Sequence, residues 1–173
     1  MRVWRLAAAA VLWLGLAPAA FAACTGADVL FQDNFDKLQP TWGEPSDVMK
    51  VDNGQLIVTP AADQYFWAPN TANLYDDIDM CVTMTTVTGV SPEDAKAGLI
   101  FWYVDANNFY AFELAPNGKA SVWRRQRGRW LKQVEWQDAK GANAGDGAIN
   151  ELRVTTVGSQ ATFYVNEIGR AHV

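Results

Sequence analysis

The chain has 173 residues, of which 50% are hydrophobic and 12% are aromatic, a composition that suits one soluble domain with a sizeable core. Its formal net charge of −5 argues against a nucleic-acid partner, because binding to a phosphate backbone requires a dominant basic surface. The one basic cluster, within 124–132, is interleaved with tryptophan and is too small to follow a nucleic-acid strand.

Residues 1–22 have the pattern of an export signal. Two arginines precede an apolar stretch, and Ala20 and Ala22 are the small residues of a cleavage site. The stretch is too short and too rich in alanine for a membrane anchor, and no other segment is predicted to span a bilayer. We therefore expect cleavage after Ala22 and a periplasmic or secreted mature protein.

Cys24 and Cys81 are the two cysteines of the chain, and an even pair in an oxidising compartment favours a disulfide. By loop entropy such a bond would contribute roughly 4 kcal/mol to stability. The alternative is a lipoprotein anchored at Cys24, because the residues FAAC resemble a lipidation signal. Phenylalanine fits that signal poorly, and lipidation would leave Cys81 without a partner, so the disulfide is the favoured interpretation.

Residues 23–166 read as strand and turn almost throughout, which predicts one all-β domain, most simply an antiparallel two-sheet sandwich. The strands expected in the first half are Val29–Phe35, a hairpin of 48–51 and 55–59, Tyr65–Trp67 and Asp77–Val87. Four consecutive antiparallel strands are expected in Gly98–Val134, followed by a last hairpin of 151–157 and 161–166.

Turn chemistry predicts the register of the four central strands. The residues at 116–118 and 127–128 are those of three-residue and two-residue hairpin loops, and a third turn is expected at 105–108. These turns place four residues in one cross-strand row: Trp102, Ala111, Trp123 and Lys132. The apolar face expected from this register is Leu99, Phe101, Tyr103, Tyr110, Phe112, Leu114 and Val122. A slip of one residue would exchange the two faces.

The opposite face combines aromatic rings with charged side chains. Because flat rings stack on sugars and charged groups bond to hydroxyls, this face is a candidate carbohydrate-binding surface. Its candidate substrate-binding residues are Trp102, Glu113, Trp123, Arg125, Trp130 and Lys132. The alternative is that the rings and the guanidinium group only stack on one another, as such pairs do on many sheets.

Catalytic residues are not identified by the sequence. Glu113 is the single carboxylate on the candidate face, and glycoside hydrolysis ordinarily uses two. The acidic residues at 76–79 and 105–108 do not have the spacing of a calcium loop, and no Cys/His spacing fits a metal. We therefore expect neither a metal nor another cofactor.

Several motifs occur in a fixed order between Val29 and Asn166: LFQDNFD, VDNGQLIV, AGLIFWYVDANNFYAFEL, NGKASVWRRQRGRW and NELRVTTVGSQATFYVN. In order and spacing they resemble the concanavalin A-like jelly-roll superfamily, and within it the family 16 glycoside hydrolase-like domain of unknown function tied to 3-keto-disaccharide hydrolases. The resemblance implies a jelly roll associated with carbohydrate. Of the motifs typical of the enzyme branch, only Glu113 matches.

The last seven residues, EIGRAHV, correspond to the translation of a common short-read sequencing adapter. We therefore predict that 167–173 is a non-native tail and that the jelly roll is truncated at its C-terminus. A closing strand normally lies beside the first strand in this superfamily, so Val29–Phe35 is expected to have an unpaired edge.

The sequence thus favours an exported jelly-roll domain that binds a glycan or oligosaccharide. One alternative is a glycoside or 3-keto-glycoside hydrolase or lyase that uses Glu113 as a general acid or base. Another is a structural domain of the cell envelope without a small ligand. Nothing in the sequence predicts the oligomeric state.

Overall fold

The computed structural model describes residue 24 and residues 28–85, 95–166 and 168–172; the predicted export signal lies outside these ranges. The described strands are β1 (Met49–Asp52), β2 (Gln55–Val58), β3 (Asp79–Thr85), β4 (Ala97–Asp105), β5 (Asn108–Leu114), β6 (Lys119–Gln126), β7 (Arg129–Asp138), β8 (Ile149–Val157), β9 (Gln160–Val165) and β10 (Ile168–His172). One turn of 3-10 helix spans Pro40–Trp42. No helix in the described part of the chain is long and apolar enough to cross a membrane.

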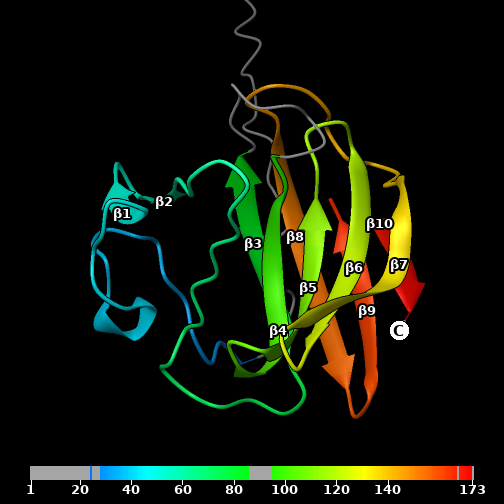
Figure 1. Cartoon of the computed structure of the whole chain (residues 1–173), viewed down its shortest axis with the longest axis horizontal. Coiled ribbons are helices and arrows are strands. Elements are labelled where there is room, and N and C mark those ends of the chain that lie inside the picture. The colour runs from blue at the N-terminus through cyan, green and yellow to red at the C-terminus, as the bar shows by residue number, and fades with distance from the viewer. Residues whose placement is uncertain (1–23, 25–27, 86–94, 167, 173) are drawn as a thin grey trace, which may run out of the picture.

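Two antiparallel four-stranded sheets, in the orders β10-β9-β8-β3 and β4-β5-β6-β7, make up most of the molecule. They pack against each other as a sandwich, and the β1–β2 hairpin lies to one side of it (Figure 1). The prediction of an all-β, two-sheet antiparallel sandwich is therefore confirmed.

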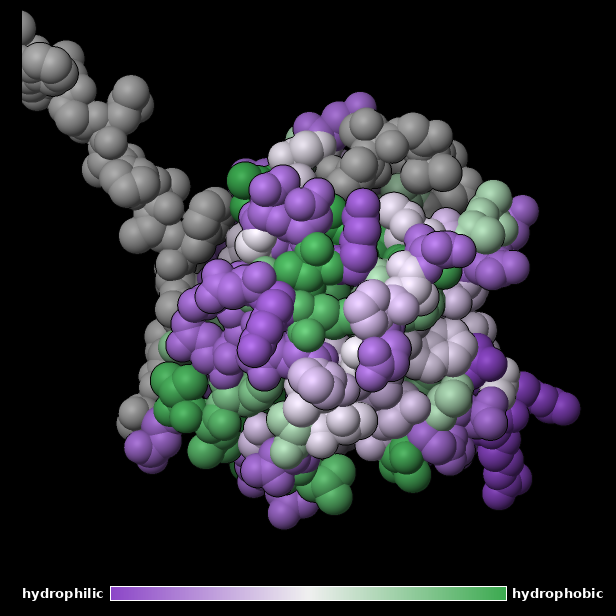
Figure 2. All heavy atoms as spheres, turned by 90° about the vertical axis from the view of Figure 1, so that its left-hand side faces the viewer, coloured by the Kyte–Doolittle hydropathy of each residue, from purple (hydrophilic) through white to green (hydrophobic). Residues whose placement is uncertain are grey.

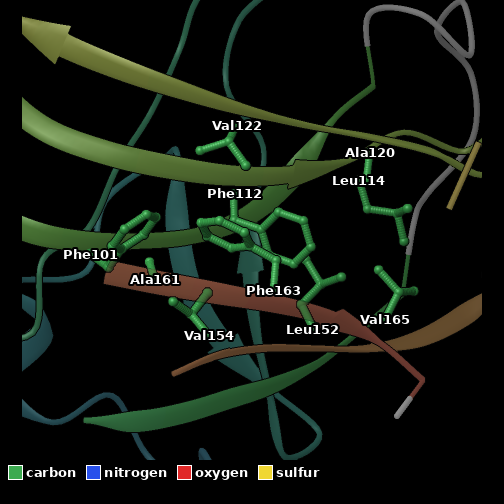
Figure 3. Close-up of a cluster of buried hydrophobic side chains, with 10 residues drawn as sticks. All are labelled: Phe101, Phe112, Leu114, Ala120, Val122, Leu152, Val154, Ala161, Phe163 and Val165. Carbon is green, nitrogen blue, oxygen red and sulfur yellow. The ribbon is translucent and has the colours of Figure 1, made fainter. Parts of the chain in front are cut away.

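The core lies between the two sheets and is formed by residues that alternate along β4, β5, β6, β8 and β9. Its buried members are Phe101, Phe112, Leu114, Ala120, Val122, Leu152, Val154, Ala161, Phe163 and Val165 (Figure 3). The ring of Phe163 contacts those of Phe101 and Phe112, with centroids 5.5 and 5.0 Å away, and so joins the two sheets. The inner residues of β3, which also pack against this cluster, are Met80, Val82 and Met84.

Two predicted strands are not formed. Tyr65–Trp67 belongs to the long connection between β2 and β3, and Val29–Phe35 is irregular. In the second segment Asp33 Oδ1 accepts a hydrogen bond from the Phe35 backbone, and Phe35 has a φ of 54°. This local turn breaks the extended conformation that a strand needs, because the side chain of Asp33 competes for the backbone donor.

The first part of the chain instead organises around Trp42. Its Nε1 donates to Asp33 Oδ2 at 2.9 Å, and its ring contacts those of Phe31 and Phe35. Other apolar side chains of this part face solvent, and Leu74 is 93% exposed. On the side of the molecule that carries β1 and β2, hydrophobic residues form separate small groups among hydrophilic ones (Figure 2).

The register of the central sheet confirms most of the turn-based prediction. Ala111 pairs with Trp123, and Trp123 pairs with Lys132. The pairing of Trp102 with Ala111 is wrong, because Ile100 occupies that place and the β4–β5 register shifts between Phe101 and Asp105. The shift is a bulge at Trp102, whose φ is 47°.

This bulge exchanges the faces of two neighbouring residues. The ring of Trp102 contacts those of Phe101 and Tyr110 and packs against the core, where Tyr103 was expected. The ring of Tyr103 instead contacts Phe109 at 5.8 Å. The sequence could not show this exchange, since a bulge changes the side-chain alternation without a glycine to mark it.

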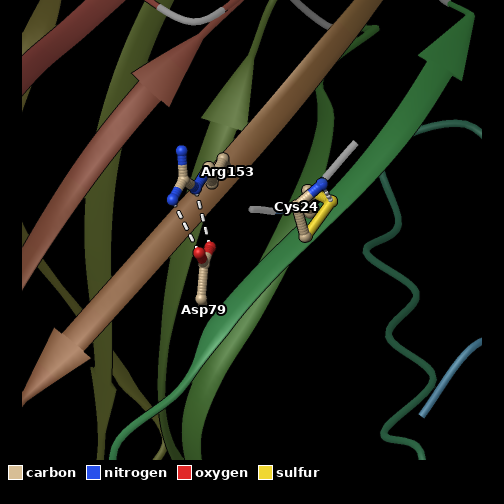
Figure 4. Close-up of a disulfide and its surroundings, with 4 residues drawn as sticks. Cys24, Asp79 and Arg153 are labelled. Atoms are coloured by element: carbon tan, nitrogen blue, oxygen red, sulfur yellow. Dashed lines mark hydrogen bonds and ion pairs between the residues drawn. A yellow bond between two sulfur atoms is a disulfide. The ribbon is translucent and has the colours of Figure 1, made fainter. Parts of the chain in front are cut away.

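A disulfide joins Cys24 to Cys81 in β3, as predicted (Figure 4). Nearby, Arg153 of β8 makes a two-pronged hydrogen-bonded ion pair with Asp79 of β3, at 2.7 and 2.6 Å. Disulfides persist in oxidising compartments, so this bond is typical of a protein located outside the cytoplasm.

Within the predicted tail, the backbone of Ile168–His172 forms β10 and pairs antiparallel with β9. Glu167 and Val173 lie outside the described residues. A backbone ladder forms with almost any sequence, so this pairing does not test the origin of the tail, which stays a prediction.

Candidate functional site

The face of the β4–β7 sheet that is turned away from the other sheet, here called the outer face, carries five of the six predicted binding residues. Cross-strand pairing places Glu113 opposite Ser121, Trp123 opposite Lys132 and Arg125 opposite Trp130. The sixth residue, Trp102, lies on the inner side because of the bulge described above. The predicted row of four is therefore Ile100, Ala111, Trp123 and Lys132, with a single tryptophan.

The connection between β2 and β3 lies against one end of the outer face. The ring of Tyr65 is 5.6 Å from that of Trp130, and the ring of Trp67 is 5.4 Å from that of Phe109. Phe109 also meets Trp130 edge-to-face, with centroids 5.5 Å apart. The segment predicted as a strand thus acts as a cover held by aromatic contacts.

Arg125 lies between two of these rings. The carbon of its guanidinium group is 5.0 Å from the ring centroid of Trp67 and 5.2 Å from that of Trp130. Its Nε atom is buried without a hydrogen-bond partner. This arrangement is the aromatic stacking that the alternative interpretation predicted, and it leaves little of Trp130 for a ligand.

Trp123 is half-buried and has a defined orientation. Its Nε1 donates to Ser121 Oγ at 2.9 Å, and Lys132 Nζ is 5.4 Å from its ring centroid. Lys132 is itself held by Glu135, with Nζ 2.8 Å from Oε2. A half-buried indole beside the small Ala111 and a partly exposed ammonium group can stack on a ring and bond to its polar substituents.

Glu113 is the most perturbed acid of the outer face. Burial raises the pKa of Glu113 from 4.5 to about 7, and the charge of Lys96 partly opposes that rise. Lys96 Nζ is 5.4 Å from the ring of Tyr65 and 6.0 Å from that of Trp136. A carboxyl group with such a pKa can donate or accept a proton near neutral pH.

The sequence interpretation missed several residues of this site, among them Tyr65, Trp67, Lys96 and Trp136. The first two come from a connection whose path no periodicity predicts. Lys96 precedes β4, outside the predicted strands. Two register shifts between β6 and β7, from Ala120 to Trp123, change the alternation that would have placed Trp136.

Within the described ranges, no three His, Cys, Asp or Glu side chains are grouped so that they could hold a metal ion. No protein-family model, curated protein or solved structure matches the chain. The concanavalin A-like resemblance therefore remains a prediction from the sequence motifs.

Proposed function

We propose that the chain is an exported carbohydrate-binding domain and that its ligand lies on the outer face over Trp123. The observation that carries the proposal is the fixed indole of Trp123, flanked by Ala111, Lys132 and the buried carboxyl of Glu113. A sugar ring stacked on the indole would present its hydroxyls to the charged side chains, and Arg125 and Trp130 would support the site from under the cover.

Binding to a panel of neutral oligosaccharides tests this proposal. We expect Trp123→Ala to weaken binding about fivefold, because a stacked ring contributes on the order of 1 kcal/mol. Trp42→Phe is the matched control, since Trp42 lies in the first part of the chain and contacts Phe31 and Phe35 instead. A folded protein that binds no saccharide would favour the structural envelope role.

The raised pKa of Glu113 favours a second candidate, a glycoside or 3-keto-glycoside hydrolase or lyase. In that role the protonated carboxyl would donate to the leaving oxygen, or the ionised form would accept a proton. The test is turnover of 3-keto-glucosides and ordinary glucosides by the wild type and by Glu113→Gln. Turnover that survives the substitution would remove Glu113 from the chemistry.

We further propose that residues 1–22 are cleaved and that the mature protein is periplasmic or secreted. The disulfide supports this location, and it uses the sulfur of Cys24 that a lipid anchor would need. The intact mass of the exported protein distinguishes the two forms. A chain that starts at Ala23 with two fewer hydrogens fits the disulfide, whereas added lipid mass at Cys24 would establish the lipoprotein alternative.

A further inference from the structure

A hollow of about 350 Å³ lies at the end of the sandwich where the β4–β5 and β8–β9 turns meet, and its wall includes Trp102 and Ser159. Figure 1 shows both turns at the same, lower end of the molecule. Ser159 comes from one sheet, and Trp102, Tyr110 and Arg124 come from the other. The volume is sufficient for a small ring compound such as a monosaccharide.

The aromatic wall of the hollow depends on the bulge in β4. Trp102 has a φ of 47°, which is rare for a bulky side chain, and its ring meets that of Tyr110 at 81° with centroids 5.2 Å apart. Such strained backbone conformations are concentrated at binding and active sites. The bulge interrupts the β4–β5 register between Phe101 and Asp105, and Trp102 forms part of the wall of the hollow there.

Arg124 gives the hollow a positive charge. Arg124 pairs with Tyr110, and Tyr110 pairs with Phe101 of the core. The side chain of Arg124 therefore lies on the inner side of the sheet, which is otherwise apolar. The carbon of its guanidinium group is 5.2 Å from the ring centroid of Tyr110. Among the described residues, no carboxylate lies within 4.0 Å of Arg124.

The acidic side chains of this end are held by the turns. Asp105 accepts hydrogen bonds from the Asn107 backbone and from the Asn108 side chain, and Asp77 accepts one from the Gly158 backbone at 2.6 Å. Arg125, whose Nε is buried without a hydrogen-bond partner, also lines the hollow. The guanidinium group of Arg125 itself is held on the outer face between Trp67 and Trp130, so Arg124 is the arginine that gives the hollow its positive charge.

We propose that this hollow binds the carboxylate of an acidic sugar, a hexuronate residue, which Arg124 holds through its planar pair of N–H donors. Guanidinium matches carboxylate geometry with two parallel hydrogen bonds, and the rings of Trp102 and Tyr110 provide flat walls for the sugar. Ser159 adds a hydroxyl-bearing residue to the wall on the side of the other sheet. The choice of a sugar as the ligand rests on the proposed carbohydrate-binding function. The hollow is a second site, separate from the one over Trp123.

The experiment is a calorimetric titration of the full chain with three ligands: methyl glucuronide, methyl glucoside and methyl glucoside 6-sulfate. We expect the glucuronide to bind at least tenfold more tightly than the neutral glucoside. Arg124→Gln should abolish this preference, and Arg124→Lys should restore it only in part, because an ammonium group lacks the fork of donors. Arg129→Gln, at an exposed arginine of β7, should leave it unchanged.

Equal affinity for glucuronide and glucoside, or a preference that survives in folded Arg124→Gln, would overturn the inference. Tighter binding of the sulfate ester than of the glucuronide would overturn the assignment to a carboxylate. Trp123→Ala separates this site from the outer face. If that variant and the wild type bind no neutral oligosaccharide but keep the glucuronide, the proposed function fails at the outer face while the hollow stands.

Discussion

The carboxyl group of Glu113 couples the stability of the protein to pH. The pKa of Glu113 is about 7 in the folded chain, against an ordinary value of 4.5 that applies to the unfolded chain. Between pH 4.5 and pH 7 the folded state therefore keeps a proton that the unfolded state has lost. Since the folded state binds more protons in this window, the stabilisation is complete below pH 4.5 and is lost as pH rises through 7.

We expect Glu113→Gln to remove this dependence. The pKa difference of 7 minus 4.5 corresponds to a free energy of up to about 3 kcal/mol. When the pH is raised from 4.5 to 8, the free energy of unfolding of the variant should therefore increase by roughly 1–3 kcal/mol relative to that of the wild type. Urea unfolding at the two pH values measures the change. The control is Glu135→Gln, whose side chain is 77% exposed and should show no comparable gain. Parallel pH profiles for wild type and Glu113→Gln would contradict the burial of this acid.

The elements of the central sheet show where sequence reasoning succeeds and where it stops. The loops at 116–118 and 127–128 contain the residues that their backbone conformations require, with Gly118 and Gly128 at φ values of 79° and 76°. Local chemistry therefore predicted the pairing of β5 with β6 and of Trp123 with Lys132. The β4 bulge has no such signal, because a tryptophan occupies the left-handed position.

The same bulge predicts an unusual order of stability among variants. Trp102→Gly should be more stable than Trp102→Ala by about 1 kcal/mol, because glycine adopts a φ of 47° without the steric cost that alanine incurs. Both variants lose the same ring contacts, so chemical denaturation isolates the backbone effect.

Trp130 provides the matched comparison for this test. It lies in β7 with an ordinary strand conformation, where Trp130→Ala should be the more stable of the two variants, since glycine weakens strands. The same order at both positions would show that Trp102 does not occupy a left-handed bulge.

The covalent link between Cys24 and β3 acts on the whole molecule. The two cysteines are 57 residues apart, so the disulfide restricts a long loop of the unfolded chain and stabilises the fold by about 4 kcal/mol. The variant Cys24→Ser with Cys81→Ser should lose most of this free energy of unfolding. Thermal unfolding of the variant and of the wild type, each with and without reductant, measures it. Two results together would contradict this role: a thermal unfolding midpoint of the wild type that does not change with reductant, and a variant that is as stable as the wild type.

The amino-acid sequence was sufficient to predict the all-β class, the cysteine pair, the hairpins around 53–54 and 116–118, and the alternation that buries Phe112 and Val122. These features depend on residues close together in the chain, whose turn and pleat preferences are local. The three-dimensional packing was needed to show that Tyr65 and Trp67 cover the outer face and that Trp102 turns to the inner side. Those outcomes depend on which distant rings can pack together, and the periodicity of a single strand does not contain that information.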